Sequence, residues 1–240
     1  VMASSSTAFT AYGITDRLKP EHEKYVEAFQ TAAQAFTEAD ELFDDRDFIA
    51  KRGWKKETEM NTGEAVYSKN TPNGKMATVS VCFDTAICTK MKFLRVDIES
   101  MPEWDPNINY AKIDVKFTNY SDIVRYGSNQ ILIVSGREII AARMQRPIAN
   151  GGYRLAMRST PLADIPESND KVRAIVHLGA YQFRPHPEFP ETKTLYDFIM
   201  LVDLKGSIPR WMINPVIPKI TAMDTDERAK HFKELGEKKQ

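Results

Sequence analysis

The chain has 240 residues, and its 33 basic residues balance its 33 acidic ones, so the formal net charge is zero. A neutral chain lacks the overall positive field that attracts proteins to phosphate backbones, so no nucleic-acid partner is expected. The length suits one large domain or two small ones. The sequence contains no run of about 18 apolar residues, so no membrane span is predicted.

The two cysteines, Cys82 and Cys88, have neither the spacing of metal ligands nor the pattern of a disulfide framework. Buried thiols in a reducing compartment explain them best. We therefore expect a cytoplasmic protein, which would sit at an organelle membrane if an anchor or targeting segment precedes Val1.

The first third of the chain predicts a leader, a helix and three strands. Residues 1–17 are small and polar, which is typical of a flexible leader. Apolar residues recur at helical spacing over residues 18–48, and alternating residues over 54–83 predict three strands with turns at Gly63 and Asn73-Gly74. Residues 85–96 then predict a short helix.

The rest of the chain predicts many strands followed by a last helix. The candidate strands are residues 113–117, 123–126, 131–144, 153–157, 172–183 and 194–202. The prolines of residues 184–191 indicate a loop between the last two strands. Pro215 and Pro218 fall inside the final apolar segment and predict a bend near Asn214 between two short helices. This order is typical of an α+β domain with an antiparallel sheet.

Catalytic and metal-binding patterns do not emerge from the sequence. The four histidines are scattered, and neither a Gly-x-Ser-x-Gly nor a His-Glu-x-x-His frame is present. His186 and Glu188 lie among prolines that indicate a surface loop, and no glycine-rich loop opens a helix to hold phosphate. We predict no catalytic residue, no metal site and no cofactor.

Several segments carry a resemblance to one known family when they are taken in order. They are Gly53–Lys55 with Glu64–Ser68, Pro102–Pro106, Val134–Arg143, Lys171–Ala174 and Asp203–Asn214. Together they resemble the motifs of START domains, a lipid-transfer family, and most of all the branch of steroidogenic acute regulatory proteins. The resemblance implies a helix-grip fold, in which a curved antiparallel β-sheet wraps around a long C-terminal helix and encloses a lipid tunnel. It also implies a single lipid-binding domain over residues 18–236.

Arg143 is the main candidate for recognising a ligand. It shares strand parity with Ile139 and Ala141, although residues alone leave open that the strand ends here and Arg143 reaches solvent. The resemblance implies instead that Arg143 projects into the tunnel, pairs with an acid of the neighbouring strand and helps to recognise a ligand hydroxyl. The family's acid position aligns with Gly127, so the partner is left open among Ser128, Asn129, Asp114 and Asp197.

The resemblance also implies an entrance formed by residues 127–134 and the start of the last helix, near 211–217. Trp211 would sit at a membrane interface there, or pack beneath the helix. The residues predicted to bind the ligand are Trp104, Ser128, Asn129, Ile139, Ala141, Arg143, Trp211, Met212 and Val216.

The function that the resemblance implies is non-enzymatic binding and intracellular transport of an apolar lipid, such as a sterol or a carotenoid. The alternatives are a lipid-gated sensor or interaction module, and an enzyme that uses the cavity. We expect a monomer whose partners are a hydrophobic small molecule and, transiently, membranes. We also expect Arg143→Met to weaken binding of hydroxylated lipids with little loss of stability, because methionine is similarly long.

Overall fold

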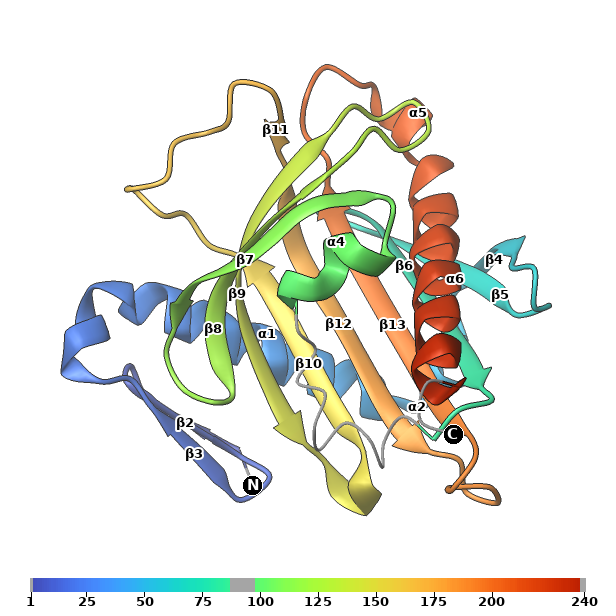
Figure 1. Cartoon of the computed structure of the whole chain (residues 1–240), viewed down its shortest axis with the longest axis horizontal. Coiled ribbons are helices and arrows are strands. Elements are labelled where there is room, and N and C mark those ends of the chain that lie inside the picture. The colour runs from blue at the N-terminus through green and yellow to red at the C-terminus, as the bar shows by residue number, and fades with distance from the viewer. Residues whose placement is uncertain (1, 87–97, 238–240) are drawn as a thin grey trace.

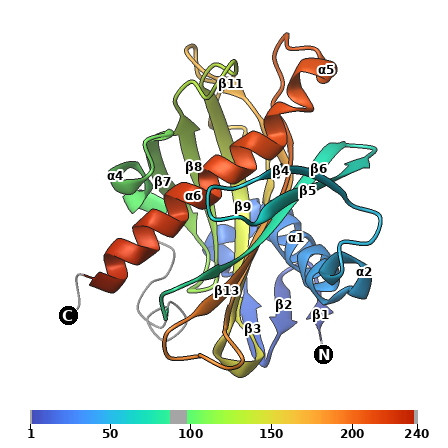
Figure 2. The same ribbon diagram turned by 90° about the vertical axis from the view of Figure 1, so that its right-hand side faces the viewer.

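A curved β-sheet organises the chain in the computed structural model, which describes residues 2–86 and 98–237 (Figure 1). Nine strands follow one antiparallel path in the order β4-β5-β6-β13-β12-β10-β9-β8-β7, and β11 pairs in parallel with β9. The sheet curves around helix α6, Val216–Glu237, while helix α1, Val26–Asp44, packs on its opposite face (Figures 1 and 2). The predicted α+β helix-grip fold is confirmed.

The strands of the large sheet are β4 Lys55–Glu59, β5 Ala65–Thr71, β6 Gly74–Phe83, β7 Ile108–Lys116, β8 Ser121–Ser128, β9 Arg137–Pro147, β10 Tyr153–Ser159, β11 Val172–Arg173, β12 Ile175–Pro185 and β13 Thr194–Asp203. The shorter helices are η1 Pro20–Tyr25, α2 Arg46–Ile49, η2 Ile98–Ser100, α4 Met101–Trp104, η3 Ala149–Gly151 and α5 Arg210–Ile213. No helix in the described ranges is long and apolar enough to cross a membrane.

In strand β9, successive side chains point to opposite faces of the sheet and so contribute to two different packing layers. Ile140, Ala142 and Met144 pack into the cluster that contains the apolar face of α1. Ile139 and Ala141 belong to a cluster on the other face, towards α6, and Arg143 shares their parity. The sequence-based prediction of a shared face for these three residues is therefore correct, and it sets the position of the site.

The N-terminal residues are ordered, which differs from the expected flexible leader at 1–17. Strands β1 Ala3–Ser4, β2 Ala8–Ala11 and β3 Ile14–Arg17 form a separate three-stranded sheet. Tyr12 and Gly13, with φ values of 53° and 76°, form the two-residue turn between β2 and β3. Phe9 and Ala11 are buried in the core against α1. Strands β2 and β3 were not predicted because each has only four residues and a small polar segment precedes them, so the alternation of apolar and polar residues is too short to recognise.

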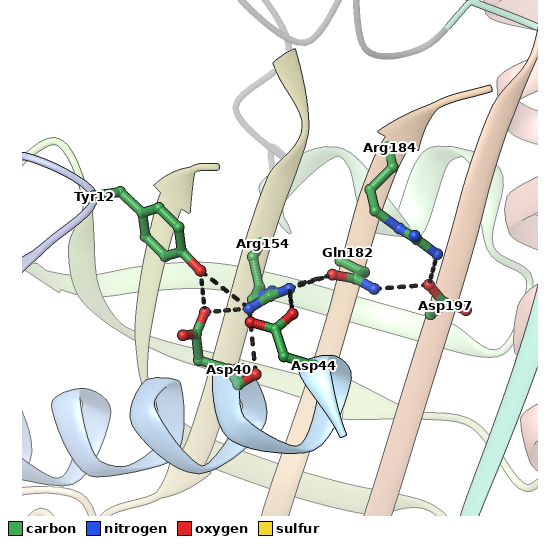
Figure 3. Close-up of polar contacts among 7 residues, drawn as sticks. All are labelled: Tyr12, Asp40, Asp44, Arg154, Gln182, Arg184 and Asp197. Atoms are coloured by element: carbon green, nitrogen blue, oxygen red, sulfur yellow. Dashed lines mark hydrogen bonds and ion pairs between the residues drawn. The ribbon is translucent and has the colours of Figure 1, made fainter. Parts of the chain in front are cut away.

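Buried arginines fasten α1 and the N-terminal sheet to the convex face of the large sheet. The polar network of Figure 3 joins Tyr12, Asp40, Asp44, Arg154, Gln182, Arg184 and Asp197. At its centre Arg154 of β10 forms an ion pair with Asp40 of α1 and donates to Gln182 Oε1 from Nη2 at 2.7 Å. Arg146 of β9, which is fully buried, lies 3.2 Å from Asp16 of β3. These charges hold the two layers together because each buried cation has a partner.

One predicted element needs correction, and another lies mostly outside the described residues. Residues 131–136 form a loop rather than the start of a strand, because Ile131 and Val134 hydrogen-bond each other and Leu132 has a φ of 55°. The predicted helix over 85–96 falls mostly on residues 87–97, which the structure does not describe.

The predicted bend near Asn214 is confirmed, because α5 ends at Ile213 and α6 begins at Val216, but only α5 is short, since α6 has 22 residues. Its expected cause was the loss of hydrogen bonds at two prolines inside a helix. Pro215 instead precedes α6, and Pro218 lies in its first turn, where backbone N–H groups have no acceptor within the helix. The prolines therefore mark the start of α6 and do not weaken its interior.

Candidate functional site

A largely apolar cavity lies between the large sheet and α6. The space open to the centre of a water molecule is about 170 Å³, which is room for on the order of ten waters and is consistent with a small-molecule site. Strands β8, β9, β10, β12 and β13 form its floor, and Ile220 and Met223 of α6 contribute to its roof. Apolar wall residues from the strands include Ile139, Leu155, Met157, Val176, Phe198, Met200 and Val202.

The ion pair between Arg143 and Asp122 lies at this cavity. The two residues are directly opposite in the β8–β9 ladder, and their exposed fractions are 5% and 8%. Arg143 donates from Nε to Asp122 Oδ1 at 2.8 Å and from Nη2 to Oδ2 at 2.7 Å. Burial lowers the pKa of Arg143, but the charge and hydrogen bonds of Asp122 outweigh burial and raise it. Arg143 therefore stays cationic inside the protein.

The partner of Arg143 differs from every candidate named from the sequence. Gly127, the aligned position of the family's acid, pairs with Glu138, which is five residues from Arg143 along β9. Five strand residues span about 17 Å, so a side chain at Gly127 would not reach Arg143. Asp122 is directly opposite, which makes it the acid of the pair.

The four other candidate partners are occupied elsewhere. Asp114 pairs with Arg125, and Asp197 accepts a hydrogen bond from Arg184 at 2.8 Å. Ser128 Oγ accepts from the backbone N–H of Arg137 at 3.0 Å. Asn129 donates to the carbonyl of Pro106 at 2.9 Å.

The cavity wall brings together only part of the predicted ligand-binding set. Ser128, Ile139 and Arg143 line it. Ala141 is fully buried on the same face of β9, in a small cluster with Ile98, Met101 and Val124.

The other predicted residues lie at its margins. Trp104 of α4 stacks on His231 of α6 with ring centroids 4.4 Å apart, and Asn129 is exposed at the end of β8. Trp211 is 75% exposed and Met212 is half-buried, both on α5, whereas Val216, the first residue of α6, is buried in the core. None of these five belongs to the wall that the described residues form.

Several polar residues of the cavity were missed by sequence reasoning. Asp105, Tyr126 and Tyr181 line it, as do Asp224 and Arg228 of α6. One signal was present in the sequence for the last two. They are four residues apart and share a helix face with the buried residues Ile217, Thr221 and Phe232. An oppositely charged pair on the apolar face of a helix indicates buried polar chemistry.

The described residues contain no group of three or more His, Cys, Asp or Glu side chains positioned to hold a metal ion. The polar groups of the cavity include two cation–carboxylate pairs and two phenols, which are suited to hydrogen bonding of a ligand.

Comparisons with known proteins agree with this architecture. Steroidogenic acute regulatory-like protein 1 of Caenorhabditis elegans is 40% identical over 231 residues, which cover 96% of this chain and 88% of that protein. The mitochondrial steroidogenic acute regulatory protein of Mus musculus is 27% identical over 174 residues, covering 70% of this chain. The match spans 59% of the mouse protein, less than two thirds of its length.

Among solved structures, human StAR-related lipid transfer protein 5 superposes with a TM-score of 0.73 at 19% sequence identity. The match covers 88% of this chain and 99% of that one, and it shows a shared fold. The family model of the START domain matches residues 33–238. The chain therefore belongs to the START domain family.

Proposed function

We propose that this chain binds one apolar lipid with a neutral polar group, such as a sterol or an oxygenated carotenoid, and carries it between membranes without changing it. The observation that carries this proposal is the Arg143–Asp122 pair at the wall of a largely apolar cavity. The pair has no net charge, and its two hydrogen bonds leave Nη1 of Arg143 for a ligand oxygen. A few polar groups in an apolar wall are typical of sites that orient a lipid.

Apolar burial supplies the binding energy in this proposal. Each 300 Å² of lipid surface removed from water contributes roughly 7 kcal/mol at about 25 cal/mol per Å², before ordering and desolvation costs are subtracted. The Arg143–Asp122 pair then selects among lipids of similar size. A ligand without an oxygen atom would displace water from the pair and offer no hydrogen bond in its place, which lowers its affinity.

Transport without a chemical reaction is supported by the hydrogen bonding of the Ser128 hydroxyl. Ser128 Oγ accepts a hydrogen bond from a backbone N–H and has no base beside it to activate it as a nucleophile among the described contacts. The human protein that shares the fold is named a lipid transfer protein, which also supports transport. One cavity inside one chain also favours action as a monomer.

The end of the molecule that carries the β8–β9 loop and α5 is proposed to touch membranes. Leu132 and Ile133 of the loop are 46% and 55% exposed, and Trp211 of α5 is 75% exposed. Both segments lie at the same end in Figures 1 and 2, and Ile131 and Val134 of the loop line the cavity. Exposed apolar side chains beside an entrance suit contact with a bilayer during lipid uptake. The expected gate at residues 127–134 and 211–217 stays a prediction.

The compartment also stays a prediction. The sequence favoured the cytoplasm, and the mouse relative is named as a mitochondrial protein.

Transfer of a fluorescent sterol between liposomes tests the proposal. Donor vesicles would carry dehydroergosterol and acceptor vesicles an energy-transfer quencher. We expect the wild-type chain to accelerate transfer, and the variant Arg143→Met/Asp122→Leu to reduce the acceleration about tenfold, since one hydrogen bond to a charged group has about this effect. Lys230→Met, which removes an exposed charge of α6, serves as the control. Binding without transfer would favour a lipid-gated sensor, and neither binding nor transfer would refute the proposal.

A further inference from the structure

A second polar group faces the cavity from α6, on the side opposite the sheet. Asp224 and Arg228 both line the cavity, and Arg228 is only 5% exposed. Arg228 Nη2 lies 3.6 Å from Asp224 Oδ2, which is too long for a hydrogen bond. In the described part of the chain, no group hydrogen-bonds Arg228 Nε or Asp224 Oδ2. Buried polar atoms are rarely left in this state without a ligand or water to satisfy them.

Packing, and not hydrogen bonding, holds Arg228 in place. The guanidinium carbon lies 5.5 Å from the ring centroid of Trp104 and 5.4 Å from that of Tyr181. Trp104 is itself fixed by its stacking on His231. Two aromatic faces stabilise the cation without using its N–H groups. The Nε–H group of Arg228, which has no hydrogen-bond partner among the described residues, is therefore positioned to bind an oxygen in the cavity.

Tyr181 adds a hydroxyl to the same group. Its side chain lines the cavity, and its hydroxyl is buried with no hydrogen-bond partner among the described residues. Burial raises the pKa of Tyr181 to about 12, so the phenol stays protonated and acts as a donor. The charges of Arg143 and Arg228 both act on Tyr181 and also on Tyr126, which places the two arginines around one region of the cavity.

Charge balance decides which ligand chemistry fits. The cations Arg143 and Arg228 each have a carboxylate beside them, Asp122 and Asp224. Burial raises the pKa of the remaining acid, Asp105, towards the neutral form. A carboxylate or phosphate bound at either pair would add negative charge where the cation already has a carboxylate, whereas hydroxyl and carbonyl groups would not. Arg137, the third cation in the cavity wall, already donates its N–H groups to the carbonyls of Ser135, Leu204 and Lys205.

We propose that Arg228, Asp224 and the Tyr181 hydroxyl form a second polar subsite, so that the cavity selects a lipid whose polar end bears two neutral oxygen functions. The sheet-side subsite at Arg143 takes one oxygen, and the helix-side subsite takes the other. This inference rests on the proposed function and narrows its ligand class from lipids with one polar group to lipids with two.

Matched sterols test the inference. Cholesterol and 7β-hydroxycholesterol differ by one hydroxyl on the ring system, and the dissociation constant of each is measured by displacement of dehydroergosterol. We expect the wild-type chain to bind the diol about 10- to 150-fold more tightly, the effect of one added hydrogen bond to a charged group. Arg228→Met/Asp224→Leu should bring this ratio close to one and change cholesterol affinity less than about threefold, because replacing both partners leaves no buried charge unpaired.

Two further variants complete the test. Tyr181→Phe keeps the ring against Arg228 and removes only the hydroxyl, so it should lower the ratio by about threefold with the fold intact. Lys219→Met removes an exposed charge of α6 and should leave the ratio unchanged. Cholesterol binding without a preference for the diol, or a preference that survives in both cavity variants, would overturn the inference and leave the proposed function standing. Failure to bind either sterol would overturn both.

Discussion

The pair between Arg143 and Asp122 makes a quantitative prediction about stability. Their side chains are 6% and 12% exposed, and two hydrogen bonds join them. Arg143→Met leaves the Asp122 carboxylate buried without its cation, and breaking a buried pair in this way costs about 3–5 kcal/mol. Asp122→Leu leaves the guanidinium unpaired and should cost a similar amount. This replaces the sequence-based expectation that Arg143→Met has little effect on stability.

The double variant Arg143→Met/Asp122→Leu isolates the interaction. It removes both charges and fills the space with apolar atoms, so we expect a free energy of unfolding within about 2 kcal/mol of the wild type. The two single changes would together predict a loss of about 6–10 kcal/mol if they were independent. The difference is the coupling energy of a double-mutant cycle.

Urea titration followed by tryptophan fluorescence measures all four proteins. For a chain of this size, each 1 kcal/mol shifts the thermal midpoint by about 2–4 °C, so each single variant should melt roughly 6–20 °C lower. The double variant should melt near the wild type. A double variant that is destabilised by the sum of the two single losses would show no coupling and would refute the buried pair.

Two further predictions concern polar contacts outside the cavity. Arg154→Met, which removes the centre of the network in Figure 3, should lower the free energy of unfolding by about 3–5 kcal/mol and speed hydrogen exchange in residues 8–17; unchanged exchange there would contradict the fastening role. Burial raises the pKa of Glu57, but the hydrogen bond from Lys75 and its neighbours lowers it to about 2, below the ordinary 4.5. This depressed pKa contributes stability above about pH 4.5 that is lost as pH falls towards 2. Glu57→Gln should flatten the fall in urea midpoint between pH 5 and pH 2, and equal slopes for both proteins would contradict it.

The alternation and spacing of apolar residues predicted the strands and helices because they reflect the direction in which successive side chains point. Alternation placed Ile139, Ala141 and Arg143 on one face of a strand, and the structure puts all three on the side of the sheet that faces α6. The helical spacing of apolar residues predicted α1, and the prolines predicted the break before α6.

The acid of the pair escaped prediction because strand register is set between segments. The β8–β9 ladder places Asp122 opposite Arg143, whereas alignment of the loop had pointed to Gly127. A shift of register moves every cross-strand partner, and the sequence of one strand does not fix it.

Long-range packing also decides which side chains enter the cavity. Arg228 is a solvated residue by type, and only its place on the buried face of α6 brings it against Trp104 and Tyr181. Trp211, which the sequence left open between a membrane interface and packing beneath the helix, is 75% exposed on α5.

Native mass spectrometry of the purified chain after incubation with liposomes of mixed composition tests the central claim most directly. We predict a complex of one chain with one lipid molecule, which dissociates as a neutral, hydroxyl- or carbonyl-bearing lipid enriched over its share in the vesicles. A chain that stays lipid-free, or that binds phosphate-bearing lipids in proportion to the vesicle composition, would contradict a cavity built for neutral oxygen functions.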